Sequence, residues 1–210
     1  MKTDGVLFDL DGTLWDSTNG VTMVWNRVAQ ELCPGVRGPV EQQEVRSCMG
    51  LLLPDIGKKL FPGLSGERQQ QIVDTFCARE VELLAQTGGQ LYPGLRETLE
   101  SLCRRFPLFI VSNCQSGYIE CFLKAHDMGK FFADIECAGN TGLPKWENIR
   151  LVAKRNRLSA PVYVGDTALD GKSARQAGVT FVHAQYGFGA CDDADCKINS
   201  IGELLTVLEK

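Results

Sequence analysis

The stretch Val6-Leu-Phe-Asp9-Leu-Asp11-Gly-Thr13 decides the fold class of this chain, because it joins a buried strand to two closely spaced acids. A short apolar run bounded by a turn signal is typical of a strand in a buried sheet. Strand side chains alternate, so Asp9 and Asp11 are expected on the same side. Two adjacent carboxylates repel each other unless a cation or a proton neutralises them. A solvated turn is the alternative interpretation of the pair taken alone.

Similar β-type runs recur along the chain between longer helical patterns. The predicted strands are Val6 to Leu10, Leu108 to Ser112, Ile135 to Ala138, Val162 to Gly165 and Thr180 to His183. The predicted helices between and after them are Tyr118 to His126, Ile149 to Ala153, and a terminal helix marked by the capping-box spacing of Ser200 and Glu203. This alternation predicts an α/β fold with a parallel sheet. In such sheets, ligands bind at the carboxyl ends of the strands.

The stretch from Asp16 to about Gly89 breaks the alternation, because only helical patterns are evident in it. The predicted helices are Val21 to Leu32, a segment from Val45 to Phe61, and Glu67 to Gln86. Glycine and proline punctuate the chain directly after this stretch, at residues 88–89 and 92–94. We interpret residues 16–87 as a helical insertion, and residues 1–15 and 88–210 as one α/β domain.

Length and composition exclude several classes of protein. At about 150 residues per domain, the 210 residues suit one domain with an insertion, and 44% hydrophobic with 23% charged residues is a globular composition. The net charge of −4 offers no basic field for nucleic acid. No stretch approaches about 18 apolar residues, which predicts no membrane span. Nine cysteines without a C-x-x-C pair, and no secretion signal, predict free thiols and a cytoplasmic protein.

Three further segments place polar or charged groups where parallel strands end or helices begin. Ser112 and Asn113 end the second predicted strand, ahead of a helix whose exposed N–H groups suit an anion. Lys145 opens a helix, where a cation is disfavoured unless an anion lies nearby. Asp166 and Asp170 follow the fourth predicted strand. Each segment taken alone also has an ordinary structural interpretation as a loop, cap or surface residue.

Taken together and in this order, the segments resemble the four motifs of the haloacid dehalogenase superfamily, in its phosphatase branch with a helical cap. The motifs are Asp9-Leu-Asp11-Gly-Thr13, Ser112-Asn113, Lys145 and Gly165-Asp166-Thr-Ala-Leu-Asp170. The resemblance covers essentially the whole chain. It implies a Rossmann-like parallel sheet with helices on both faces, with residues 16–87 as the cap. The segment from Met49 to Pro54 is similar to the cap loop that faces the substrate in phosphoglycolate phosphatase-like members.

The resemblance also implies roles for the acidic residues. Asp9 is expected to attack phosphorus and become an aspartyl phosphate. Asp11 is expected to act as general acid and then general base, and its backbone carbonyl to ligate the metal. Asp9 and Asp166 are expected to bind Mg²⁺ directly, and Asp170 to coordinate it or orient its surroundings. The residue types suit these roles, because Mg²⁺ prefers hard oxygen ligands.

The remaining motif residues are expected to hold the phosphate. Ser112 and Lys145 are expected to bind phosphoryl oxygens, Asn113 to support that loop, and Thr13 to order the first motif. Zinc is disfavoured, because the chain has two histidines and lacks metal-binding cysteine spacings. Three cap cations, Arg46, Lys58 and Lys59, are expected either to meet an acidic substrate or to be solvated.

These expectations predict an Mg²⁺-dependent phosphatase that hydrolyses a small phosphorylated metabolite. The family's dehalogenases and phosphonate hydrolases lack a carboxylate at the position of Asp11. Sugar phosphomutases share all four motifs and stay an alternative, although the cap has no Ser-Arg pair like the one with which they hold a second phosphate. A binding or regulatory protein on the same fold is a further alternative, because fold does not determine function. The sequence does not indicate the oligomeric state.

Overall fold

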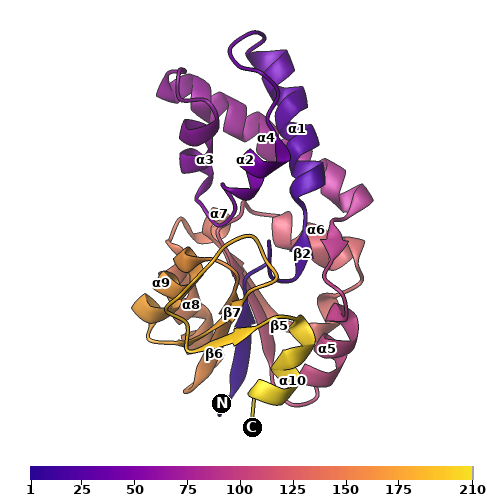
Figure 1. Cartoon of the computed structure of the whole chain (residues 1–210), viewed down its shortest axis with the longest axis vertical. Helices are drawn as coiled ribbons and strands as arrows, with labels where there is room; N and C mark the ends of the chain where they lie inside the picture. The colour runs from indigo at the N-terminus through magenta and orange to yellow at the C-terminus, as the bar shows by residue number, and fades with distance from the viewer. Residues whose placement is uncertain (210) are drawn as a thin grey trace.

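The computed structural model describes residues 1–209, which form a six-stranded parallel sheet with helices on both faces and a group of helices above it (Figure 1). The strand order is β5-β4-β1-β6-β7-β8. The strands are β1 (Gly5–Phe8), β4 (Leu108–Ser112), β5 (Phe132–Cys137), β6 (Pro161–Gly165), β7 (Thr180–Ala184) and β8 (Cys196–Ile198). Each neighbouring pair is parallel. The predicted α/β fold is confirmed.

Alternating side chains of the central strands bury both faces of the sheet. Val6 and Phe8 join the hydrophobic cluster that packs against α5, α6 and α10, whereas Leu7 joins the cluster under α8 and α9. These helices are α5 (Leu95–Leu102), α6 (Tyr118–Ala125), α8 (Lys145–Arg155), α9 (Ala168–Ala177) and α10 (Leu204–Val207). Strands buried on both faces read as continuous apolar runs, which is why the sequence revealed them.

The helical insertion lies between β2 (Trp15–Asp16) and β3 (Gln90–Leu91), which pair antiparallel at its base. Its helices are α1 (Thr18–Leu32), α2 (Gln42–Arg46), α3 (Leu53–Leu60) and α4 (Gly66–Thr87), and we call this group the cap. The prediction of one helical segment from Val45 to Phe61 is wrong. Gly50 adopts a left-handed φ of 81° and Pro54 lies in the first turn of α3, so the chain turns between two shorter helices.

The cap has a hydrophobic core of its own. Trp25 of α1 stacks on Phe76 of α4 with ring centroids 3.7 Å apart. The helix α4 continues beyond this cluster, because Leu84 near its C-terminal end packs in the cluster of the α/β domain. One helix therefore ties the two cores together. The boundaries 16 and 87 of the cap stay a prediction.

Several short elements were not predicted or differ from expectation. Strands β2, β3 and β8 are only two or three residues long, too short for a periodic pattern. The expected capping box does not form, because Ser200 makes no side-chain cap hydrogen bond and Glu203 accepts the backbone N–H of Asn199 instead. The terminal helix is correspondingly short. The remaining elements are the 3₁₀ turns Gly129–Phe131 and Ile201–Glu203 and the helix α7 (Ala138–Thr141).

All nine cysteines are free thiols in the structure. Among the helices of residues 1–209, none has the length and apolar character required to cross a lipid bilayer.

Candidate active site

The candidate site lies where the carboxyl ends of three neighbouring strands meet beneath the cap. Asp9 follows β1, Ser112 ends β4, and Asp166 follows β6. Strand β1 pairs with β4 on one side and with β6 on the other. The chain therefore leaves the sheet in different directions around β1, which opens a crevice at these strand ends.

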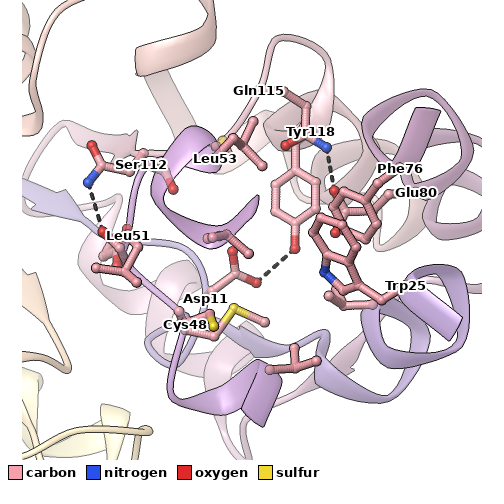
Figure 2. A pocket seen from close by; sticks show the side chains of 18 residues that line it. Asp11, Trp25, Cys48, Leu51, Leu53, Phe76, Glu80, Ser112, Gln115 and Tyr118 are labelled. Atoms are coloured by element: carbon pink, nitrogen blue, oxygen red, sulfur yellow. Dashed lines mark hydrogen bonds between the residues drawn. The ribbon is translucent and has the colours of Figure 1, made fainter. Parts of the chain in front are cut away.

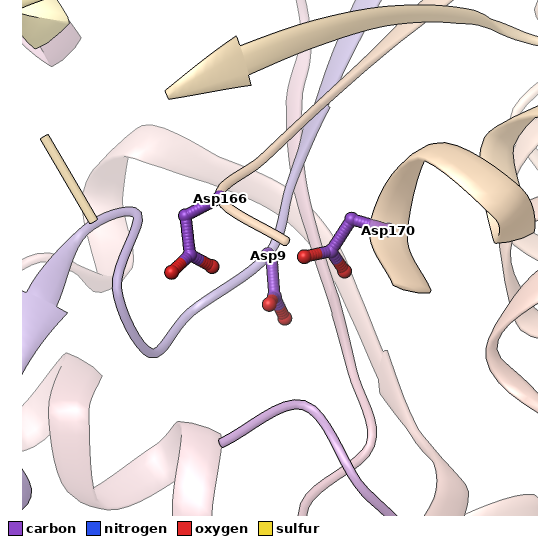
Figure 3. Close-up of side chains that lie close together, drawn as sticks. All are labelled: Asp9, Asp166 and Asp170. Carbon is purple, nitrogen blue, oxygen red and sulfur yellow. The ribbon is translucent and has the colours of Figure 1, made fainter. Parts of the chain in front are cut away.

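Three buried carboxylates cluster in this crevice. Asp9, Asp166 and Asp170 each offer an oxygen atom, and these atoms lie within 4.8 Å of one another (Figure 3). All three side chains are less than 5% exposed. Like charges at this spacing in a buried site are unfavourable unless a cation offsets them. The geometry is that of a cation-binding site with hard oxygen ligands.

Lys145, the first residue of α8, supplies part of that positive charge. Its Nζ lies 2.7 Å from Oδ1 of Asp170 and 3.0 Å from Oδ1 of Asp9, and all three side chains are buried. Burial alone would lower the pKa of Lys145, but the neighbouring carboxylates raise it well above its usual value. The ammonium group therefore stays charged. This pairing explains a buried lysine at the positive end of a helix dipole.

Asp170 has both carboxylate oxygens occupied. Oδ1 accepts from Lys145, and Oδ2 accepts the backbone N–H of Thr167 at 3.0 Å and its hydroxyl at 2.6 Å. The hydroxyl of Thr167 is also 3.3 Å from the N–H of Asp170, so the two residues form a capping box at the start of α9. The start of a helix thus orients Asp170 toward Lys145.

Asp166 is held differently, with one oxygen left free. Oδ2 accepts the backbone N–H of Phe188 at 2.7 Å, while Oδ1 is buried without a hydrogen-bond partner in the described chain. The backbone packs tightly around it, because a Cβ on Gly187 would lie 2.5 Å from Oδ2 and one on Gly12 only 2.1 Å from it. An unpartnered buried carboxylate oxygen is costly. This oxygen is the clearest sign that the cluster fits a metal ion.

The electrostatics of the cluster support the same interpretation. Burial, with a smaller contribution from Asp170, raises the pKa of Asp9 to about 7 against the opposing effect of Lys145. Burial and the two neighbouring carboxylates raise the pKa of Asp166 well above its usual value. Three carboxylates facing one ammonium leave negative charge uncompensated. A bound divalent cation would offset it and favour the ionised acids.

Asp11 lies outside this cluster and is held by three hydrogen-bond donors. Its Oδ1 accepts from Nε1 of Trp15 at 2.9 Å and the hydroxyl of Ser17 at 2.6 Å. It also accepts from the hydroxyl of Tyr118 at 2.8 Å, the bond drawn in Figure 2. Burial raises the pKa of Asp11, and the three donors partly lower it again. No hydrogen bond from residues 1–209 reaches Oδ2. The carboxyl group is therefore fixed in orientation with one oxygen available for proton transfer.

A cavity of about 60 Å³ connects Asp9 and Asp11 with the cap. Ser112 and Asn113 line its floor on the α/β domain. Its roof includes the loop 47–52 between α2 and α3, which we call the cap loop. The amide of Asn113 donates to the carbonyl of Gly50 at 2.8 Å, which ties the cap loop to the Ser112-Asn113 motif. A direct contact therefore joins the two parts of the molecule at the cavity.

Comparison with known proteins identifies the family. The haloacid dehalogenase-like hydrolase family matches this chain over residues 6–184. The chain belongs to this family of hydrolases. Its predicted resemblance to the superfamily is confirmed.

Individual relatives of this hydrolase agree with that assignment. A phosphoglycolate phosphatase from Vibrio parahaemolyticus is 28% identical, with 97% of this chain and 95% of the relative covered. One from Vibrio cholerae is 29% identical, with coverage of 97% and 96%. A crystal structure from Haemophilus somnus, described as a predicted phosphoglycolate phosphatase, superposes with a TM-score of 0.85 at 20% identity, covering 97% of each chain. The predicted enzyme class, a phosphatase of this superfamily, is confirmed.

The structure brings most of the predicted site residues of this hydrolase together. Asp9, Lys145, Asp166 and Asp170 form one buried cluster, and Asp9, Asp11, Ser112 and Asn113 line the cavity beside it. Thr13 is the exception, because it does not line the cavity. Its buried hydroxyl has no hydrogen-bond partner among the described residues, and its carbonyl accepts from the hydroxyl of Tyr186 at 2.9 Å.

The cap cations of the hydrolase do not reach the cavity. Arg46 pairs with Asp16 at 3.0 Å and Lys58 with Asp55 at 3.1 Å, both on the surface. The ammonium group of Lys59 donates to the carbonyl of Ser47. Of the two expectations for these cations, only a role away from the substrate agrees with their positions.

Sequence reasoning missed several residues of the site. Two of the three donors to Asp11, Trp15 and Ser17, follow it within six residues, but Tyr118 lies 107 positions away, so no local pattern connects all three. Glu80 of α4 is buried in the cavity wall, where the amide of Gln115 donates to it. One signal was available, because Ile72, Phe76, Glu80 and Leu84 follow one another at intervals of four residues. An acid on the apolar stripe of a helix is a candidate for a buried functional group.

Proposed function

We propose that this hydrolase cleaves small phosphate monoesters through an aspartyl phosphate on Asp9, with Asp11 as the general acid and base and Mg²⁺ as the metal. One observation carries the proposal. Asp9 lies in the cation-binding cluster and lines the same cavity as Asp11, whose carboxyl group is oriented by three donors. The two acids thus have different environments, and different environments are what a nucleophile and a proton donor require.

In the first half-reaction, an ionised oxygen of Asp9 attacks phosphorus as the bond to the leaving oxygen breaks. Asp11, in its protonated form, gives its proton to that oxygen, so the product leaves as an alcohol. Burial favours the protonated form of Asp11, because it raises the pKa of this carboxyl. The donors Trp15, Ser17 and Tyr118 keep the group aimed and stabilise the carboxylate left after the transfer.

In the second half-reaction, Asp11 takes a proton from a water molecule, whose oxygen then attacks phosphorus. The acyl-phosphate bond breaks, inorganic phosphate leaves, and the carboxylate of Asp9 is restored. The net change is one ester and one water converted to one alcohol and one phosphate. The cap covers part of the cavity, and displacement of water by a bound substrate would strengthen electrostatic interactions within it.

The groups that would hold Mg²⁺ are the side chains of Asp9 and Asp166 and the backbone carbonyl of Asp11. Asp170 would either coordinate the ion itself or orient the groups around it. The free oxygen of Asp166 and the excess of carboxylates over ammonium groups fit a hard divalent cation. When bound, the ion would supply positive charge for the phosphoryl oxygens. Lys145 shares that task, because its ammonium group lies 3.0 Å from the nucleophile.

Ser112 and Asn113 complete the proposed phosphate site. Ser112 is buried at the end of β4 and lines the cavity beside Asp9, which suits its hydroxyl to a phosphoryl oxygen. The contact of Asn113 with the cap loop suits a supporting role in this motif. Thr13 is assigned to ordering the first motif, since its carbonyl anchors Tyr186.

The test is phosphate release from a panel of phosphate monoesters that includes 4-nitrophenyl phosphate, with Mg²⁺ and with EDTA. We expect turnover that requires Mg²⁺ and disappears in Asp9→Asn. Asp192→Asn is the matched control, because Asp192 is exposed and distant in the chain from every motif. Turnover undiminished in Asp9→Asn would exclude this nucleophile. Isomerisation of a sugar phosphate without phosphate release would indicate the phosphomutase alternative, and binding without either reaction a regulatory protein.

A further inference from the structure

We propose that Glu80 determines the substrate class of this site, by selecting phosphate esters whose short leaving group ends in a hydrogen-bond donor and rejecting those that end in a carboxylate. This inference rests on the phosphatase function proposed above. It assigns recognition of the leaving group to Glu80, whereas the four sequence motifs are assigned to the phosphate group and its metal ion.

Glu80 is a buried acid with a free hydrogen-bonding position. Its side chain belongs to the wall of the cavity and is only 4% exposed (Figure 2). The amide of Gln115 donates to Oε2, and within residues 1–209 the other oxygen, Oε1, has no hydrogen-bond partner. Unlike the free oxygen of Asp166, Oε1 is not sealed off by the protein, so a ligand in the cavity can reach it. A donor on the substrate is the natural partner for Oε1.

Gln115 connects this acid with the reaction centre. It follows the Ser112-Asn113 motif in the same loop, and its hydrogen bond reaches across from the α/β domain to α4 of the cap. Both Gln115 and Glu80 line the cavity that contains Asp9 and Asp11. A leaving group bound to the phosphate site therefore extends toward Glu80.

The charge of the cavity disfavours an anionic leaving group. Its lining includes three acids, Asp9, Asp11 and Glu80, and none of its described lining residues is lysine, arginine or histidine. Lys145 faces Asp9 and Asp170 instead of the cavity wall. Burial, with the charge of Asp11 adding to it, raises the pKa of Glu80 to about 8. Negative charge is thus costly in this cavity even for Glu80 itself, and a substrate carboxylate would bring a charge that no cation among the described lining residues offsets.

The other walls favour a small apolar body on the leaving group. Trp25, Phe76, Leu51 and Ile56 lie around the cap side of the cavity, which measures about 60 Å³. Apolar walls with a few polar groups are typical of binding sites that orient a small ligand through hydrogen bonds at one of its ends. A chain of two or three carbon atoms carrying an amine or a hydroxyl group fits this description.

The experiment compares four esters of nearly equal size that differ at one end. They are 2-aminoethyl phosphate, 2-hydroxyethyl phosphate, propyl phosphate and carboxymethyl phosphate, the last being phosphoglycolate. We expect kcat/KM for at least one of the first two to exceed that for phosphoglycolate by about tenfold or more, the scale of one polar contact. The amine and hydroxyl esters separate an ion pair with Glu80 from a neutral hydrogen bond.

Variants assign the preference to Glu80. Each kcat/KM is divided by the value for propyl phosphate in the same variant, so a general loss of activity cancels. In Glu80→Gln, the ratio of the preferred donor ester to phosphoglycolate should fall by about tenfold, whereas Glu80→Asp should retain its direction. Glu82→Gln is the matched control, because Glu82 is exposed on the same helix, and it should leave the ratio unchanged.

Three outcomes would overturn the inference while leaving the phosphatase function intact. The first is a preference of the native enzyme for phosphoglycolate, and the second is an unaltered ratio in Glu80→Gln. The third is turnover of 4-nitrophenyl phosphate with none of the four short esters. Absence of Mg²⁺-dependent turnover with every ester would instead overturn the proposed function itself.

Discussion

The acids of the carboxylate cluster and the acid of the cap are buried in opposite ways. Asp9, Asp166 and Asp170 lie close together at the strand ends, and Lys145 pairs with Asp9 and Asp170. Glu80 lies on the cap side of the cavity next to apolar side chains, without a cation beside it among the described lining residues, and the amide of Gln115 donates to it. The cluster is arranged to hold charge, whereas the cap cavity penalises it. We therefore assign the proposed chemistry to the carboxylate cluster and the proposed substrate selectivity to the cap cavity.

The largest effect is expected from replacing Asp9, the proposed nucleophile in the cluster. Asp9→Asn should lower kcat/KM for phosphate release by about 10⁴-fold or more, because an amide cannot form the acyl phosphate. Its thermal unfolding should remain cooperative, since the variant keeps the size of the side chain and removes one of several like charges. Steady-state phosphate release and a thermal melt measure the two effects. Loss of folding along with activity would show that the cluster also depends on this charge.

The next effect concerns the ion pairs of the cluster. Lys145→Met should lower the free energy of unfolding by about 3 to 5 kcal/mol, because two buried carboxylates lose their partner. Urea denaturation measures the loss, and Mg²⁺ should restore more stability to this variant than to the native chain. Lys172→Met is the control, since Lys172 is exposed on α9. A loss below about 1 kcal/mol would mean that the pairs behave like surface pairs.

A pH dependence distinguishes the cap acid from the cluster. Burial raises the pKa of Glu80 from 4.5 to about 8, so the folded state binds its proton more tightly than the unfolded state. This contribution to stability is complete below about pH 4.5 and is lost as pH rises through about 8. The native chain should therefore lose about 2 kcal/mol relative to Glu80→Gln between pH 6 and pH 8.

Denaturant unfolding of the two chains at both pH values measures this difference. Asp11 and Tyr118 also face Glu80, and the comparison of two chains that share them isolates the titration of Glu80. Glu82→Gln should follow the native chain at both pH values. Parallel stability curves for the native chain and Glu80→Gln would show that Glu80 titrates as an exposed acid does.

The smallest effect is expected at the contact that joins the two regions. Asn113→Ala removes the hydrogen bond to Gly50 and should cost about 1 kcal/mol of stability. The cap loop would close less firmly, so KM should rise a few-fold with a smaller change in kcat. Steady-state kinetics with the best ester measure this split. A fall in kcat with KM unchanged would indicate that Asn113 acts on the phosphate instead of the cap loop.

Much of the α/β domain was predictable, because its strands are short apolar runs followed by polar residues. The start of β4 at Leu108 and its end at Ser112 agree with the prediction, and the acids after β1 and β6 meet as expected. The strand β8 and the break between α2 and α3 were not predictable from periodicity. A three-residue strand is too short to show a period, and Gly50 interrupts a helical pattern through its backbone conformation.

The sequence by itself determined which groups lie at the strand ends, because a parallel sheet brings the residues after its strands to one edge regardless of what separates them along the chain. Only the tertiary structure decided how those groups are balanced. Lys145 meets Asp170 across 25 positions of the chain, Tyr118 meets Asp11 across 107, and Gln115 meets Glu80 across 35. Such pairs depend on how helices pack on the sheet, and side-chain packing leaves no period in the sequence. The four sequence motifs can therefore be recognised in short stretches of sequence. The charge balance of the site and its proposed selectivity depend on contacts between segments that are distant in the chain.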